Sequence, residues 1–211
     1  TVEETYLSLG ALAVTYSNLA NWLDVGDSWK KVTSGGAAGY DLNVLVLTNK
    51  ARPGPKPTFF LRAALHAREY ATAEAATRFA EYLAQNYGRD ADVTWLLDNF
   101  QIVIMPQANP DGRHIAEMGI YQRKNLDDTN GLCPGDATFS YQIGGDLNRN
   151  SSVEWGGIGA DTKPCSQTYR GASAHSEPEA NATRAAMAGL LPEQRGTEIT
   201  AKRPQTASRK M

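Results

Sequence analysis

A histidine and a glutamate three residues apart could bind a metal ion in this chain. His66 ends a run, residues 58–65, that is typical of a β-strand, and Glu69 falls at the start of a helical pattern. An imidazole and a carboxylate on one side of such a corner are two ligands that zinc accepts, and an open catalytic zinc site needs one more. The pair alone is a weak signal, because a glutamate at a helix N-terminus is often found beside a surface histidine.

The composition fits one globular domain. The 211 residues are 41% hydrophobic and 21% charged, which is enough apolar material to bury a sizeable core. The formal net charge is −2, so nothing favours nucleic acid or an anionic membrane surface as a partner. No run of about 18 apolar residues occurs, and we therefore expect no membrane-spanning helix.

Apolar spacing predicts the elements that must position His66 and Glu69. Residues 4–23 and 70–87 have helical spacing. In the second helix five side chains are expected to face inward: Ala75, Phe79, Tyr82, Leu83 and Tyr87. Three strands are predicted at 41–48, 58–65 and 100–105, with a proline-rich loop at 52–57.

The order strand, strand, helix, strand predicts an α/β domain with a mixed, mostly parallel sheet flanked by helices. Residues 100–105 are almost continuously apolar, as in a strand covered on both faces. Ligands gather at the carboxyl ends of strands in such sheets, and both His66 and the segment after Met105 lie there.

The region 106–175 shows little regular pattern, and a stretch of that length is unusual unless it is functional. Residues 109–112 are expected to turn the chain. Ser176 and Glu179 have the spacing of a capping box, which predicts a helix from there to about Leu191.

Two cysteines, Cys133 and Cys165, lie in this loop-rich region. Two free thiols are one interpretation. A disulfide would close a loop of 32 residues and stabilise the fold by about 3–4 kcal/mol in the chain-entropy model. We favour the disulfide, and with it a secreted, periplasmic or other extracellular location.

Four further polar clusters follow the histidine and glutamate. They are Asn109-Pro110-Asp111-Gly112, Arg123-Lys124-Asn125, Asp146-Leu147-Asn148-Arg149-Asn150 and Tyr169-Arg170-Gly171. Each is weak alone, but in this order and spacing they make chance a poor explanation. Over residues 5–195 the chain resembles the zinc carboxypeptidases of the carboxypeptidase A/B type. The resemblance implies a carboxypeptidase-like (phosphorylase/hydrolase-like) fold.

The resemblance implies a catalytic role for three residues. His66 and Glu69 would be ligands of one Zn²⁺ ion. Arg123 would polarise the scissile carbonyl and stabilise its developing oxyanion. The alternative for Arg123 is an ordinary surface charge, which is the default for any arginine.

Three further residues would bind the substrate, a peptide or protein with a free C-terminus. Asn148 and Arg149 would hold its terminal carboxylate, since a guanidinium can bind a carboxylate bidentately. Arg68 resembles the family's auxiliary arginine along the substrate path.

The resemblance also implies parts that we do not find. These are a third zinc ligand, which is a histidine that ends a later strand, a glutamate as general base and a substrate-facing tyrosine. His114 has no ligand context, and His175 precedes a helix start instead of ending an apolar strand, so we expect neither to bind zinc. The chain is divided into 1–196, two-thirds of a catalytic domain, and 197–211, an atypical basic tail expected to be disordered. The abrupt change suggests a truncation or a frameshift.

Three functions remain open. The first is a zinc metallocarboxypeptidase that is inactive, and poorly soluble or in need of a partner, as this chain. The second is a non-catalytic module that binds peptide C-termini, or a remnant of an enzyme. The third is a related zinc hydrolase that acts on amide bonds of acylated amino acids, although the Asn-Arg pair and Tyr169-Arg170-Gly171 favour the peptidase.

Overall fold

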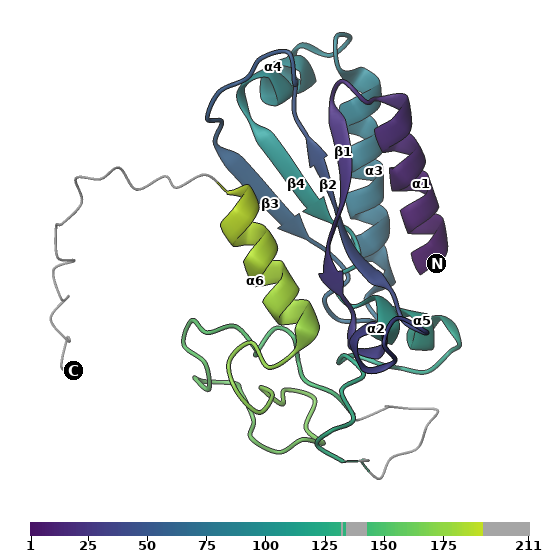
Figure 1. Cartoon of the computed structure of the whole chain (residues 1–211), viewed down its shortest axis with the longest axis vertical. Helices are drawn as coiled ribbons and strands as arrows, with labels where there is room; N and C mark the ends of the chain where they lie inside the picture. Colours follow the sequence, from purple (N-terminus) through teal and green to yellow (C-terminus); the bar gives the residue numbers. More distant parts are fainter. Residues whose placement is uncertain (132, 134–142, 192–211) are drawn as a thin grey trace, which may run out of the picture.

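The computed structural model describes residues 1–131, 133 and 143–191 (Figure 1). In chain order its elements are α1 (Val2–Thr15), β1 (Ala20–Asp27), α2 (Trp29–Thr33), β2 (Asp41–Leu47), β3 (Thr58–Arg62), α3 (Tyr70–Asn86), α4 (Ala91–Asn99), β4 (Gln101–Met105), α5 (Pro110–Glu117) and α6 (Pro178–Leu190).

Four strands form one sheet in the order β1-β2-β4-β3. β1 pairs with β2, and β2 with β4, in antiparallel register, whereas β3 and β4 run parallel. The sheet is mixed and flanked by helices, as predicted. The expectation that it is mostly parallel is wrong for the part of the chain that the structure describes, because β2 pairs antiparallel with both β1 and β4.

Helices cover both faces of the sheet. Leu45 and Ile104 pack in one apolar cluster with residues of α1, α3 and α4. Their sequence neighbours Val46 and Val103 belong to the cluster on the opposite face, which Leu190 of α6 joins. Alternate side chains of a strand point to opposite faces, so a sheet buried on both sides requires the continuous apolar runs of β2 and β4.

The predicted helix 4–23 is too long. α1 ends at Thr15, and residues 20–23 belong to β1, where Ala20 lies opposite Leu47 of β2. Their apolar residues continue the helical spacing by coincidence. Pairing with a neighbouring strand determines their structure, and apolar spacing does not report that pairing.

The buried face of α3 differs from the predicted one. Ala75 and Tyr82 are exposed, whereas Leu83 is buried and Phe79 and Tyr87 are partly buried. The buried stripe is centred on small residues, namely Ala73, Ala76, Thr77, Ala80 and Ala84. Small side chains let α3 lie close to the sheet, so its aromatic rings pack at the rim.

The predicted capping box at Ser176 is wrong. α6 has Glu177 at its N-cap, and no side chain caps it. The Ser176 hydroxyl donates instead to Glu177 Oε1 at 2.7 Å, and Glu179 is buried. Residues 109–112 turn the chain by starting α5, where Asn109 Oδ1 accepts a hydrogen bond from the Gly112 amide at 3.1 Å.

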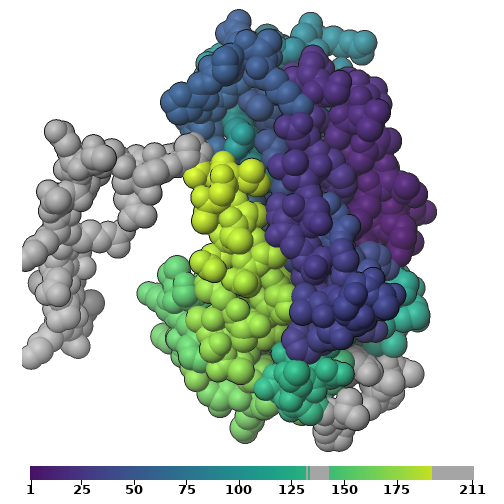
Figure 2. All heavy atoms as spheres, viewed as in Figure 1, coloured from purple at the N-terminus to yellow at the C-terminus, as the bar shows by residue number. Residues whose placement is uncertain are grey.

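α6 lies directly against β1, and Figure 2 shows the two side by side on the face viewed. Gly26 makes this approach possible. A Cβ atom at Gly26 would lie 2.7 Å from Cβ of Ala182, and its φ of 148° also disfavours a side chain.

The predicted disulfide between Cys133 and Cys165 is present. None of the helices in the described ranges is both long and apolar enough to cross a membrane. The tail 197–211 lies outside the described residues.

Candidate active site

His66 and Glu69 occupy the corner between β3 and α3. β3 ends at Arg62, Ala64 takes a left-handed conformation with φ 48°, and Glu69 is the N-cap of α3. The Glu69 amide donates to the His66 carbonyl at 3.0 Å. This tight turn brings His66 Nδ1 to 2.9 Å from Glu69 Oε1, so the two predicted ligands face each other.

Asp146 holds the other side of the imidazole ring. It is fully buried, and its Oδ1 lies 3.2 Å from His66 Nε2. Its Oδ2 accepts a hydrogen bond from Arg123 Nη2 at 3.0 Å. Burial alone raises the pKa of Asp146, but hydrogen bonds from His66 and Arg123 outweigh burial, and the pKa lies below its usual value. Asp146 is therefore an ionised carboxylate at neutral pH.

The contacts of His66 create a place for a cation. With its proton on Nε2, facing Asp146, a neutral imidazole turns the Nδ1 lone pair toward an oxygen of Glu69. His66 Nδ1 and Glu69 Oε1, which lie 2.9 Å apart, are the two atoms that would hold a zinc ion here. A carboxylate on the second ring nitrogen is the usual support of a metal-bound histidine. These donors fit zinc.

Among the described residues, two protein ligands face this place, whereas a catalytic zinc site commonly has three. His175 Nε2 accepts a hydrogen bond from the Ser152 amide at 3.2 Å, and His114 Nδ1 lies 2.9 Å from the Tyr40 hydroxyl. Neither has a described contact with His66. The third ligand that the sequence analysis did not find is also not found within residues 1–131, 133 and 143–191.

Arg123 joins the same cluster. Its carbonyl accepts a hydrogen bond from the Ala67 amide at 3.1 Å, which ties its backbone to the turn of His66. Its Nη1 lies 3.2 Å from His66 Nδ1, and its Nε donates to the Gln167 carbonyl at 3.2 Å. Only 15% of the side chain is exposed. The guanidinium is thus fixed beside the proposed ligands.

Asn109 connects the two loops that carry these groups. The residue is fully buried, and its Nδ2 donates to the Lys124 carbonyl at 3.0 Å. The same nitrogen lies 3.4 Å from the Arg123 carbonyl and 3.5 Å from that of Leu65. The start of α5 therefore holds the loop before His66 against the loop of Arg123.

Asn148 and Arg149 lie on the turn that follows Asp146. The Asn148 amide donates to Asp146 Oδ1 at 2.9 Å, and the Arg149 amide to the Asp146 carbonyl at 2.8 Å. The Arg149 side chain donates to the carbonyls of Gly159 and Asn148 at 3.0 Å each. Both residues line a hollow of about 370 Å³. No carboxylate of the described residues pairs with Arg149, so its charge is available to a ligand.

Arg68 follows the proposed ligand His66 by two residues. Its guanidinium lies 4.2 Å from the centroid of the Tyr121 ring, and its Nη1 is 3.5 Å from Gln167 Oε1. Gln167 therefore contacts Arg68 through its side chain and Arg123 through its backbone.

Asp146 and Asn109 are members of the site that were not predicted from the sequence, although both lie in the polar motifs at 146–150 and 109–112. Their roles come from contacts with residues far away in the chain. The available signal was a carboxylate beside the Asn148-Arg149 pair, which could support a histidine.

Comparison with known proteins shows the family of the chain. The family model of zinc carboxypeptidases matches residues 6–200, and the chain belongs to this family. Carboxypeptidase A2 of Mus musculus is 32% identical over 180 residues, which are 85% of this chain and 39% of the relative. Metallocarboxypeptidase A of Trichophyton tonsurans is 35% identical over 119 residues, 56% of this chain and 26% of that protein.

A solved structure shares the fold. It is bovine thrombin-activatable fibrinolysis inhibitor in complex with tick carboxypeptidase inhibitor, which matches with a TM-score of 0.71 and 25% identity. The match covers 90% of this chain and 56% of the bovine chain. The chain thus spans well under two-thirds of the length of the relatives it matches.

Proposed function

We propose that the protein containing this chain is a zinc-dependent metallocarboxypeptidase that releases C-terminal amino acids from peptides. The observation that carries the proposal is the meeting of His66, Glu69 and Arg123 at one end of β3, with the imidazole supported by Asp146. Membership of the zinc carboxypeptidase family agrees with it.

His66 and Glu69 would hold the metal. When bound, zinc supplies a Lewis acid and an acidified water at this place. An ionised Asp146 favours the His66 tautomer with its proton on Nε2, in which the Nδ1 lone pair would be the ligand. Arg123 aims its guanidinium at the same place, where it stabilises negative charge that develops on a substrate carbonyl oxygen.

Asn148 and Arg149 would select the chain end. Their turn is fixed to Asp146, so the hollow beside Arg149 has a defined position relative to the imidazole. A guanidinium without a carboxylate partner binds a peptide carboxylate strongly, whereas a C-terminal amide offers it no charge. Arg68, stacked on Tyr121, would contact the peptide upstream.

Peptide binding tests this assignment. We expect the 211-residue chain to bind a short peptide with a free C-terminus at least about tenfold more tightly than its amidated twin. Arg149→Gln should abolish the difference, and the matched change Arg89→Gln, at an exposed arginine, should preserve it. Equal binding of both peptides by the unmodified chain, measured by calorimetry, would refute the role of Arg149.

We further propose that the 211-residue chain by itself has little or no peptidase activity. Two ligands bind zinc more weakly than three, and a general base is also missing from the described part of the site. This observation favours the second candidate, a non-catalytic module that binds peptide C-termini. A purified sample that holds one tightly bound zinc and releases C-terminal residues, followed by mass spectrometry, would contradict it.

We also propose that the protein works in an oxidising compartment outside the cytoplasm. The disulfide between Cys133 and Cys165 supports this location, because such bonds persist mainly in secreted and periplasmic proteins. Thiol titration of protein isolated from its natural source tests it, and free thiols would contradict it.

A further inference from the structure

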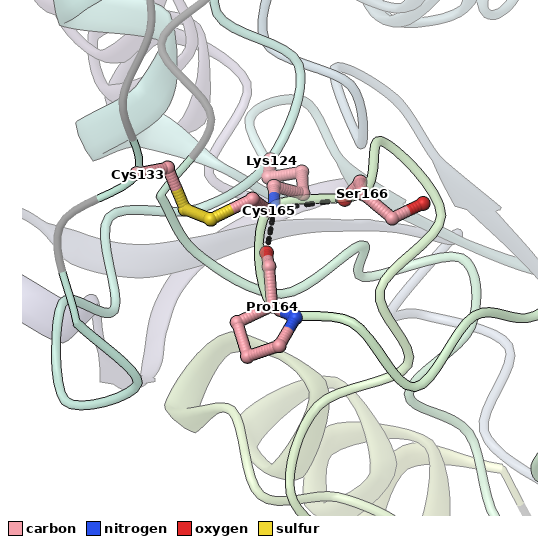
Figure 3. Close-up of a disulfide and its surroundings, with 5 residues drawn as sticks. All are labelled: Lys124, Cys133, Pro164, Cys165 and Ser166. Carbon is pink, nitrogen blue, oxygen red and sulfur yellow. Dashed lines mark hydrogen bonds between the residues drawn. A yellow bond between two sulfur atoms is a disulfide. The ribbon is translucent and has the colours of Figure 1, made fainter.

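The loop around Cys165 is held from two sides (Figure 3). Cys165 is joined to Cys133 by the disulfide. The ammonium group of Lys124 donates to the carbonyl of Pro164 at 2.6 Å and to that of Ser166 at 2.9 Å, on either side of Cys165. One short stretch of backbone is therefore held both by a covalent bond and by two charge-assisted hydrogen bonds.

Lys124 is an unusual anchor because it is completely buried. Its partners among the described residues are the two carbonyls and the ring of Tyr169, whose centroid lies 5.8 Å away. Burial lowers the pKa of Lys124 to about 8, and the carboxylates of Asp146 and Glu177 offset only part of that effect. Burying a charged ammonium without a paired carboxylate costs folding free energy, so a buried lysine at this position indicates a specific structural or functional role.

The next residue of the loop connects this anchor to the proposed oxyanion-binding residue. The Gln167 carbonyl accepts a hydrogen bond from Arg123 Nε at 3.2 Å. Arg123 and Lys124 are adjacent, and they bind adjacent parts of the same loop. The loop can hold Arg123 Nε only while it stays in place itself. Lys124 and Cys165 are the groups that hold it immediately before Gln167, and after Gln167 the Asp146 amide donates to the Tyr169 carbonyl at 2.7 Å.

We propose that Lys124 and the Cys133–Cys165 disulfide form one positioning unit that fixes the direction of the Arg123 guanidinium. A role of this unit in catalysis rests on the proposed function, in which Arg123 stabilises the oxyanion. The unit holds the Gln167 carbonyl in front of Arg123 Nε, while Asp146 holds Nη2 on the opposite edge. Bonds on two edges leave Nη1 pointing at His66. Loss of the Gln167 contact frees the guanidinium to rotate about its bond to Asp146.

The experiment follows the Nε–H proton of Arg123 by nitrogen-15 NMR in the 211-residue chain, with Arg123→Lys to assign the signal. Lys124→Met retains an unbranched side chain without the ammonium, and Cys133→Ser/Cys165→Ser removes the disulfide. We expect each to accelerate solvent exchange of this proton at least about tenfold, since a charge-assisted hydrogen bond is lost. Lys163→Met, at an exposed lysine beside the loop, should leave it unchanged. The variant that combines Lys124→Met with the two cysteine changes should accelerate exchange by less than the product of the two separate accelerations, because both changes act on one loop.

A purely structural role gives a different result. Both variants would then lower the free energy of unfolding without changing Arg123 exchange in the folded protein, and this outcome overturns the proposal. If Lys124→Met does not fold, unchanged exchange in the cysteine variant overturns it equally. The exchange measurement needs neither zinc nor peptide. Faster exchange in a chain that binds free and amidated peptides equally would uphold the positioning unit and refute the proposed function.

Discussion

His66 depends on its neighbours for the chemistry we assign to it. An imidazole has two nitrogens, and here each faces a carboxylate, one buried on Asp146 and one half-exposed on Glu69. The buried Asp146 carboxylate favours a proton on Nε2 of His66, and the half-exposed Glu69 carboxylate is a candidate metal ligand. Arg123 contacts both His66 and Asp146, so changing any of the three alters the other two.

Asp146→Asn should weaken zinc binding about 10–100-fold, the usual effect of losing the carboxylate behind a metal-bound histidine. The new amide nitrogen would face a donor of either His66 or Arg123. Competition with a chromophoric chelator measures the affinity, and His66→Ala sets the background from other sites. Asp128→Asn, at an exposed aspartate, is the matched control. Unchanged zinc affinity in a folded Asp146→Asn protein would exclude His66 as a supported ligand.

Glu179 gives the fold a pH dependence. It is buried, accepts hydrogen bonds from Asn125 Nδ2 at 2.9 Å and the Trp29 amide at 2.8 Å, and burial raises its pKa to about 7. A raised pKa means that the folded state binds the proton more tightly than the unfolded state. The contribution of Glu179 to stability should therefore be fully present below about pH 4.5 and be lost, by up to about 3 kcal/mol, as the pH rises from there through 7.

Urea unfolding between pH 5 and pH 8 measures this slope. Glu179→Gln cannot ionise and should flatten it, although Glu177, which shares Asn125 and also has a raised pKa, retains part of the effect. Glu74→Gln, an exposed change on α3, should keep the full slope. A stability of the unmodified chain that does not fall between pH 5 and pH 7 would contradict the raised pKa of Glu179.

At the level of elements, helices bring the loops of the site together. The N-cap of α5 is Asn109, whose side chain holds the loops of Leu65 and Arg123. The N-cap of α6 is Glu177, whose carboxylate accepts a hydrogen bond from Asn125. Helix starts have free backbone and side-chain polar groups, so they can bind neighbouring loops that have no regular structure.

Gly112→Ala tests the fit of α5. An added Cβ would lie 2.7 Å from the side chain of Asn109 and 2.8 Å from the Lys124 carbonyl, and we expect a loss of about 1–3 kcal/mol of unfolding free energy. Gly189→Ala on α6 is the matched control. A Cβ there meets nothing within 4 Å, and alanine is the better helix former, so it should stabilise the chain by about 0.5–1 kcal/mol. Equal effects in urea unfolding would contradict the close packing of α5.

At the scale of the molecule, the sheet of the described residues ends at β3, which pairs only with β4 on one side. Phe59 on this strand is 52% exposed. A free strand edge with an exposed aromatic ring can pair with another chain. The structural match covers 56% of the bovine chain.

The isolated 211-residue chain should therefore associate as its concentration rises. Phe59→Lys places a charge on the β3 edge and should reduce association, as charged edge strands do in natural sheets. Trp95→Lys, which replaces an exposed aromatic residue on α4, should have little effect. Light scattering over a concentration series measures both, and an equal reduction by the two variants would exclude the edge as the cause.

The sequence by itself determined the local chemistry of this protein. His66 and Glu69 are three residues apart, so the turn that joins them is enough to bring their side chains together. The apolar run at residues 100–105 similarly predicted a strand that is covered on both faces, because both sets of alternating side chains of β4 are apolar. The presence of two cysteines in one loop-rich region also favoured the disulfide that the structure contains.

Only the tertiary structure decided how these parts meet. Asp146 contacts His66 across 80 residues of chain, and Lys124 reaches the carbonyls around Cys165 across about 40. The first residues of β1 follow a helical pattern in the sequence, and their pairing with β2 makes them a strand. The physical reason is common to all three. Residue type and spacing report that a side chain is buried or charged, but its partner is set by packing between segments that are far apart in the sequence.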